Sequence, residues 1–187
     1  MASRFRLDSR SSRFSVQAFA SGMLSAFAHN PMIAVRDFAG ELILPGEGLA
    51  GGSFTLIVHA ASLEVSDNIR QKDRLEIDRV MRTDVLEIAT YPDIRFQSSD
   101  IAAESVAENW YRVTFKGNLQ LHGVTRPLQI DAQVTLLEDS CRLGGGFTIR
   151  QTDFRIKRTS AAGGMIVAKD ELKFTFDIVG KKETAPN

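Results

Sequence analysis

The sequence predicts an all-β protein, a single antiparallel barrel of roughly eight strands with one inserted α-helix. Most of the 187-residue chain alternates apolar and polar side chains with the period of two that marks a half-buried strand. Two long alternating segments are separated by a tight turn, which is typical of an antiparallel hairpin. One block, between residues 66 and 90, has helical spacing instead. Together these observations favour a closed barrel, with a β-sandwich as the second choice.

The clearest strand pair is a hairpin over residues 110–121 and 124–136, with its turn at His122–Gly123. Polar residues such as Arg112 and Lys116 form one face of the first strand, and apolar residues form the other. Because a register slip would move a whole face at once, each face is predicted as a unit. The residues predicted to point into the barrel, over the three best strands, are Tyr111, Val113, Phe115, Leu128, Ile130, Phe174 and Phe176.

Shorter alternating segments complete the predicted barrel. They cover residues 5–7, 14–16, 33–44, 53–59, 94–98, 147–149 and 172–178. Gly144–Gly146 precedes one of them, and glycine within a strand marks a bend or a barrel corner. About eight strands enclose an interior that side chains fill or that holds one small ligand.

The block that breaks the alternation predicts a helix over residues 72–83, followed by a short helical turn. Apolar residues recur there at helical spacing, and Ser66 and Asp67 are candidate N-caps. Pro92 ends any helix before it, since the residue preceding a proline avoids the helical region. A second short helix is predicted over residues 22–27.

One domain is predicted over residues 1–180, with a polar tail over 181–187. Near the start, arginines precede an apolar-leaning stretch at 14–28, a pattern that resembles a secretory signal. Polar residues interrupt this stretch, and residues 5–7 already alternate, so we expect a folded first strand and a cytoplasmic chain. The single thiol fits a reducing compartment. A homodimer stays open as the assembly state.

Composition argues against several classes of function. The chain has 23 basic and 23 acidic residues, so it lacks the basic surplus typical of nucleic-acid binding. No apolar run approaches the ~20 residues of an integral membrane helix. Three histidines without ligand spacing and one cysteine predict no metal site. Cys141 sits beside an acidic turn, which disfavours a reactive thiolate, and no nucleophile motif occurs. We therefore expect no catalytic residue, no enzyme activity and no cofactor.

Phenylalanine is abundant, with 12 residues, mostly at inward strand positions. These rings are either ordinary core or the lining of a cavity for an apolar ligand. Alternation alone leaves both interpretations open, because a packed barrel and a hollow one share the same pattern.

Two motifs lie in the middle of the chain. They are Tyr91-Pro92-x-Ile94-x-Phe96-x-Ser98 and Gly117-Asn118-Leu119-x-Leu121-x-Gly123-Val124-Thr125-Arg126-Pro127. With the upstream pair Ser62-Leu63, they resemble the YceI family, whose barrel is lipocalin-like and whose members include polyisoprenoid-binding proteins. The resemblance covers residues 53–135 well. Ser11-Ser12 stand where many members have a His-Ser pair.

The resemblance implies a barrel around an apolar tunnel that holds an isoprenoid chain or a similar lipid. The inward positions then become candidate ligand-binding residues: Phe27, Phe38, Phe54, Leu56, Phe96, Tyr111, Val113, Phe115, Leu128, Ile130, Phe147, Phe174 and Phe176. His29 and Arg36 are candidates to contact a head group at the mouth. Two alternatives stay open, an enzyme acting on a small apolar substrate and a filled barrel acting as a surface interaction module.

Overall fold

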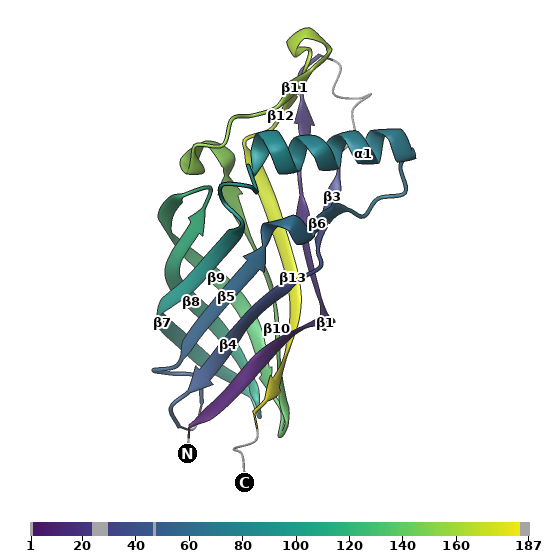
Figure 1. Ribbon diagram of the computed structural model, residues 1–187. Helices are drawn as coiled ribbons and strands as arrows, with labels where there is room; N and C mark the ends of the chain where they lie inside the picture. The colour runs from purple at the N-terminus through teal and green to yellow at the C-terminus, as the bar shows by residue number, and fades with distance from the viewer. Residues whose placement is uncertain (1, 24–29, 47, 184–187) are drawn as a thin grey trace.

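Eight antiparallel strands close into a barrel in the computed structural model, which describes residues 2–23, 30–46 and 48–183 (Figure 1). The barrel strands are β1 (Ser3–Gln17), β4 (Phe38–Leu44), β5 (Ser53–His59), β7 (Asp93–Ala107), β8 (Trp110–Leu121), β9 (Val124–Leu136), β10 (Ser140–Arg150) and β13 (Glu171–Lys182). Their order is β13-β10-β9-β8-β7-β5-β4-β1, and pairing of β1 with β13 closes the ring. The predicted fold class is confirmed.

The predicted hairpin is β8–β9, and its register confirms the predicted faces. Tyr111 lies opposite Val134, and Phe115 lies opposite Ile130. The apolar positions predicted to point inward over β8, β9 and β13 are all buried or packed against the core. The alternating residues Arg112 and Lys116 are exposed.

Two strand boundaries differ from the prediction. The segments at 5–7 and 14–16 belong to one long strand, β1, which has an irregularity between Asp8 and Arg13. Before the irregularity β1 pairs with β4, and after it β1 pairs with β3 (Met32–Val35). The segment predicted as one strand over 33–44 is therefore two strands, β3 and β4, separated at Arg36–Asp37. The two strands pair with different halves of β1.

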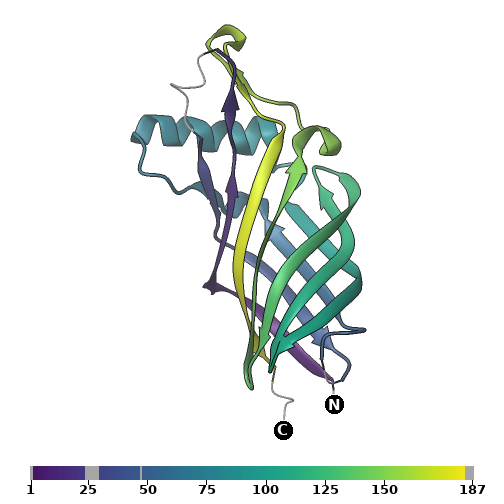
Figure 2. The ribbon, with the colours of Figure 1, turned by 180° about the vertical axis from the view of Figure 1, so that it is seen from behind.

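The upper end of the barrel, opposite the chain termini, carries the additional elements (Figure 2). β6 (Leu63–Val65) extends the sheet beyond β3. Helix α1 (Gln71–Val80) continues into a wider helical turn, Met81–Val85, close to the predicted bounds. A small sheet consists of β11 (Ser160–Ala161), β12 (Ile166–Ala168) and β2 (Ala20–Ser21). Short 3-10 turns lie at Ala60–Ser62, Gln151–Phe154 and Ala162–Gly164. Most of the helix predicted at 22–27 lies outside the described residues.

The lower end, where β1 begins and β13 ends, is filled by side chains. Leu42, Leu143 and Phe115 are almost inaccessible to solvent there. The Phe54 and Phe115 rings pack with centroids 5.0 Å apart. Gly145 belongs to the predicted glycine corner. Its lack of a side chain lets the Phe176 ring pack against the β10 backbone, since a Cβ on Gly145 would lie 2.9 Å from that ring. We call this the closed end.

Candidate ligand-binding cavity

The upper half of the barrel encloses a cavity of about 550 Å³ that is partly open to solvent. Small-molecule sites usually have volumes of roughly 300–1,000 Å³. The cavity is therefore large enough for one ligand, and it answers the question that alternation leaves open: the barrel is hollow at this end. We call the end of the cavity that β11 and β12 line the mouth.

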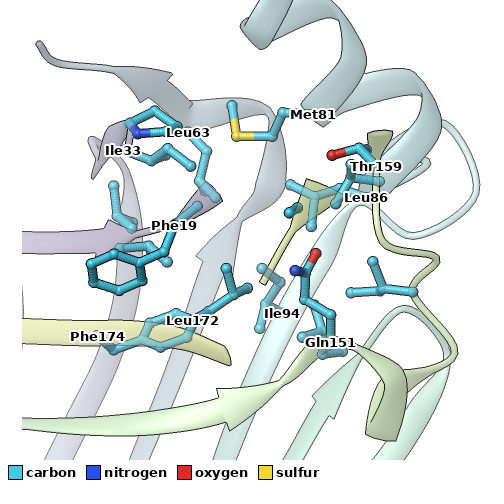
Figure 3. A pocket seen from close by; sticks show the side chains of 18 of the residues that line it. Phe19, Ile33, Leu63, Met81, Leu86, Ile94, Gln151, Thr159, Leu172 and Phe174 are labelled. Atoms are coloured by element: carbon cyan, nitrogen blue, oxygen red, sulfur yellow. The ribbon is translucent and has the colours of Figure 1, made fainter. Parts of the chain in front are cut away.

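The wall is built from the inward faces of seven barrel strands and β3. The lining residues on these strands are Phe14, Val16, Ile33, Val35, Leu56, Val58, Ile94, Phe96, Leu119, Leu121, Leu128, Ile130, Phe147, Leu172 and Phe174. Each alternates with an outward side chain, so the strand period itself makes the lining apolar. Figure 3 shows Ile33, Leu172 and Phe174 around the space.

The roof is formed by α1 and the turn that follows it. Ile77 and Val80 from the helix, with Met81, Val85 and Leu86, face the cavity. Their spacing follows one stripe of a helix. No residue of α1 is fully buried, because its apolar stripe lies over an empty space rather than over packed side chains.

Four of the lining residues are polar: Glu76, Gln151, Thr159 and Ser160. Glu76 forms a salt bridge with Arg79, 2.8 Å away, and this hydrogen bond lowers the pKa of the Glu76 carboxyl. Of the described residues, none that lines the cavity is Lys, Arg or His. The lining therefore suits an uncharged, largely apolar ligand, because a phosphate buried there would lack a cationic partner.

Gln151 is the one buried polar side chain of the described chain, with 4% of its surface exposed. Its amide Nε2 donates a hydrogen bond to the Lys169 carbonyl at 2.8 Å, which sets the orientation of the amide. The Oε1 atom has no partner within the described residues, and the amide is directed into the cavity (Figure 3). Oε1 is not among the fully buried atoms without a partner, so it is reachable from the cavity and offers a hydrogen-bond acceptor to a ligand there.

The predicted ligand-binding residues separate into groups by depth. Leu56, Phe96, Leu128, Ile130, Phe147 and Phe174 line the cavity. Phe54, Phe115 and Phe176 line only a void of about 20 Å³ beneath it. Phe38, Tyr111 and Val113 line neither space. Phe27 lies outside the described residues. Binding of a lipid by the residues that line the cavity stays a prediction.

Of the two residues predicted to contact a head group, the structure describes Arg36 alone. Arg36 is exposed, does not line the cavity, and bonds Glu64 at 2.7 Å. His29 lies outside the described residues. The lining residues that sequence reasoning missed include Phe19, Met81, Leu86 and Gln151. Helical spacing could have assigned Met81 and Leu86 to the roof, but no sequence pattern marks Gln151, which follows the end of a strand.

Comparison with known proteins decides the family. The family profile described as YceI-like domain matches residues 5–180. The chain belongs to the YceI family. No curated protein matches its sequence.

Solved structures support the YceI fold at low sequence identity. Burkholderia cenocepacia BcnA is 20% identical, with a TM-score of 0.68 over 92% of this chain and 98% of that one. A polyisoprenoid-binding domain from Saccharophagus degradans, implicated in plant cell wall breakdown, is 14% identical, with a TM-score of 0.66 over 96% and 98%. The Campylobacter jejuni YceI protein is 12% identical, with a TM-score of 0.62 over 84% and 88%.

The YceI-like motifs have a structural role in this chain. His122, in the β8–β9 turn, stacks on Tyr91 with ring centroids 4.5 Å apart and bonds the Glu87 carboxylate and the Phe154 carbonyl. A Cβ on Gly123 would lie 2.7 Å from the Tyr91 ring. His122 therefore joins three segments that are distant in sequence.

The remaining histidine and the cysteine lie away from the cavity lining. His59 is exposed, with Nδ1 3.2 Å from an Asp93 carboxylate oxygen. Cys141 is buried in the core, and burial raises the pKa of its thiol to about 12. Among the described residues, no group of three His, Cys, Asp or Glu side chains could hold a metal ion. None of the described helices has both the length and the hydropathy to cross a membrane.

Proposed function

We propose that this YceI protein binds an elongated apolar lipid, a polyisoprenoid, inside the barrel and carries it without transforming it. One observation carries the proposal: a cavity of about 550 Å³ is lined almost entirely by apolar side chains. Membership of the family and the fold shared with a polyisoprenoid-binding domain from Saccharophagus degradans support the choice of ligand class.

The energetics of such a site favour a chain-like hydrocarbon. Each CH₂ group removed from water contributes about 0.8 kcal/mol. A long chain can therefore bind tightly with few polar contacts. Gln151 supplies an acceptor for one hydroxyl at the polar end of the ligand, and the described residues of the lining include no cation that would favour a charged end.

The same lining favours carriage over catalysis. General acid–base chemistry needs positioned groups whose pKa lies near the working pH. Within the described lining, the one ionisable side chain is Glu76, and its ion pair with Arg79 holds its pKa low. A lipid in this cavity would thus meet no proton donor or acceptor suited to transforming it.

A length series tests the proposal. Isoprenoid alcohols of increasing length are titrated into delipidated protein, and affinity should rise by about fourfold for each further CH₂ buried until the cavity is full. An affinity independent of length would contradict carriage and favour the surface-interaction alternative. Native mass spectrometry of the protein as purified reports bound lipid directly, and the same spectrum shows whether the chain is a homodimer.

A matched pair of variants locates the binding. Leu128→Trp places a large ring in the cavity and should reduce affinity for every isoprenoid tested. Leu137→Trp, at an exposed residue of the closed end, adds the same ring elsewhere and should leave affinity unchanged. Equal affinities in the two variants would place the ligand outside the cavity.

A further inference from the structure

The small sheet at the mouth stands beyond the barrel (Figure 1), and exposed apolar side chains lie at its tip. Its strands are β2, β11 and β12, with Ser21 opposite Val167. Met165 follows the turn at Ala162–Gly164 and is 44% exposed. Met23 is 86% exposed, and its neighbour Gly22 lies against the Met165 carbonyl. Two exposed methionines therefore share the tip. We call β2, β11, β12 and these residues the mouth sheet.

The chain around the tip carries an excess of positive charge. Residues 155–169 include Arg155, Lys157, Arg158 and Lys169 and no acidic residue. All four are exposed, and none takes part in a salt bridge within the described chain. Arg158 Nε donates to the Ala168 carbonyl at 2.8 Å, and the Lys169 Nζ lies 6.0 Å from the centroid of the Phe19 ring.

Along the sequence, the nearest acidic residues flank this segment, and Glu76 lines the cavity beside it. Asp153 precedes the segment and Asp170 follows it. Asp170 accepts hydrogen bonds from the Thr152 hydroxyl and the Thr152 backbone N–H, at 2.7 and 2.9 Å. These hydrogen bonds are the main cause of the lowered pKa of the Asp170 carboxyl, and the charges of Arg150 and Arg158 lower it further. Asp170 is therefore turned toward the 3-10 turn, and the cations remain available on the outside.

The cations and the tip are arranged by depth. An extended chain spans at most about 3.3 Å per residue, so Arg158, four residues before the turn at Ala162, lies no more than about 13 Å behind the tip. Apolar surfaces that bind the membrane interface are buried about 5–10 Å into the boundary between head groups and acyl chains. A tip at that depth would bring Lys157 and Arg158 to the level of the lipid phosphates.

The mouth sheet is continuous with the cavity. Phe19, Ala20, Ser160, Ile166 and Ala168 line the cavity from within this part of the chain. A surface pressed against the tip would therefore lie beside the opening. The exposed methionines, the cations without salt bridges and the adjoining apolar cavity together fit one kind of partner. That partner is a surface with negatively charged groups outside and an apolar layer beneath them.

We propose that the mouth sheet docks on an anionic lipid bilayer, with the Met23–Met165 tip in the interface and the cations of 155–169 on the phosphates. The docked bilayer is the source or destination of the ligand in the proposed function, but docking needs no ligand in the cavity. The two proposals can therefore fail separately.

Vesicle co-sedimentation tests the apolar tip. The full chain should bind vesicles of equal parts phosphatidylcholine and phosphatidylglycerol, and much more weakly vesicles of phosphatidylcholine alone. Met165→Asp should lower affinity at least tenfold, because it places a carboxylate against an anionic surface. Leu137→Asp, a matched change at an exposed leucine of the closed end, should leave binding unchanged. Equal loss in both variants overturns the proposal.

A second pair of variants tests the cations. The double variant Lys157→Gln/Arg158→Gln should lose about 25-fold in affinity, about fivefold for each cation removed near the surface. Lys182→Gln, an exposed lysine at the closed end, is the control and should lose little. Binding of the unaltered chain should also weaken with added salt, because the Debye length shortens.

A fluorescence readout places the tip itself. The natural tryptophan, Trp110, lies at the start of β8, at the closed end, and its emission should not move when vesicles are added. Met165→Trp in a Trp110→Phe background should shift to shorter wavelength on anionic vesicles. No shift in a variant that still binds soluble isoprenoid overturns docking and leaves the proposed function standing. Loss of isoprenoid binding with the shift retained does the reverse.

Discussion

The two ends of the barrel are made by the same strands yet differ in their interiors. At the closed end, Leu42, Leu143 and Phe115 are buried in the packed core. At the mouth, Leu128 on β9 and Phe174 on β13 follow the same inward alternation but are half-buried around a cavity. Alternation therefore decides which way a side chain points, and position along the strand decides whether it meets another side chain or open space.

The two ends also differ in how many of their cations form salt bridges. Along the closed end and the β1–β13 seam, cations have partners: Arg4 lies 3.5 Å from Glu41, and Lys181 lies 2.6 Å from Asp8. Around the mouth, the cations of 155–169 have no salt bridge within the described chain. The docking proposal therefore rests on these cations and not on the paired ones.

The largest effect should come from truncating the closed end. Leu42→Ala should lower the free energy of unfolding by about 3 kcal/mol, because it opens a new cavity in a packed region. Leu128→Ala should cost about 1 kcal/mol, since its side chain already borders an empty space. Denaturant titrations of both variants measure this contrast. Equal losses would show that the mouth is packed.

A smaller effect is expected for the polar group of the cavity. Gln151→Leu leaves the Lys169 carbonyl without its donor, and stability should fall by about 1 kcal/mol. If Gln151 binds the ligand hydroxyl, the variant should also lose the preference for an isoprenoid alcohol over a hydrocarbon of equal length. Titration with that pair of ligands measures the preference, and an unchanged preference would mean that the hydroxyl lies elsewhere.

A still smaller effect should depend on pH at the β1–β13 seam. Hydrogen bonds from Lys181 and Ser11 lower the pKa of Asp8 from 3.8 to about 2. Because the folded pKa is depressed, this stabilisation is present at neutral pH and is lost as pH falls from 3.8 toward about 2. Asp8→Asn should cost up to about 1 kcal/mol at pH 7 and nothing at the acid end. Thermal unfolding across this pH range shows whether the difference persists.

The smallest effect is the reactivity of Cys141. Burial at the closed end raises the pKa of its thiol to about 12, so almost no thiolate exists at pH 8. Iodoacetamide should label the folded protein very slowly and the urea-unfolded protein readily. Fast labelling of the folded chain would indicate that the closed end opens often.

Much of the fold could be predicted from local pattern. The β8–β9 hairpin follows from a strict alternation on both sides of His122–Gly123, and the helix from one apolar stripe. The single long β1 and the division of 33–44 into β3 and β4 could not, because both depend on which strand β1 pairs with on each side of its irregularity. Such pairing is a tertiary choice that no window of sequence contains.

The candidate site could be predicted only in part, for the same reason. Phe115 and Phe147 both stand at inward positions, yet only Phe147 lines the large cavity. The difference arises from how far each lies from the closed end. Gln151 could not be recognised at all, since its burial depends on the path of the chain from β10 to β13. The short strands of the mouth sheet are likewise too brief to show a period.

The pairing of β1 with β13 also has a consequence for how the molecule is made. Phe5 lies opposite Lys182, so the ring closes between the first and last strands. Contacts this distant in sequence form late, because loop-closure entropy opposes them, whereas the neighbouring hairpins β7 to β10 can form early. A chain still lacking β13 is an open apolar trough with two unpaired strand edges, on β1 and β10. The interior is completed by the final strand of the barrel, so it stays open along one side until β13 has been synthesised.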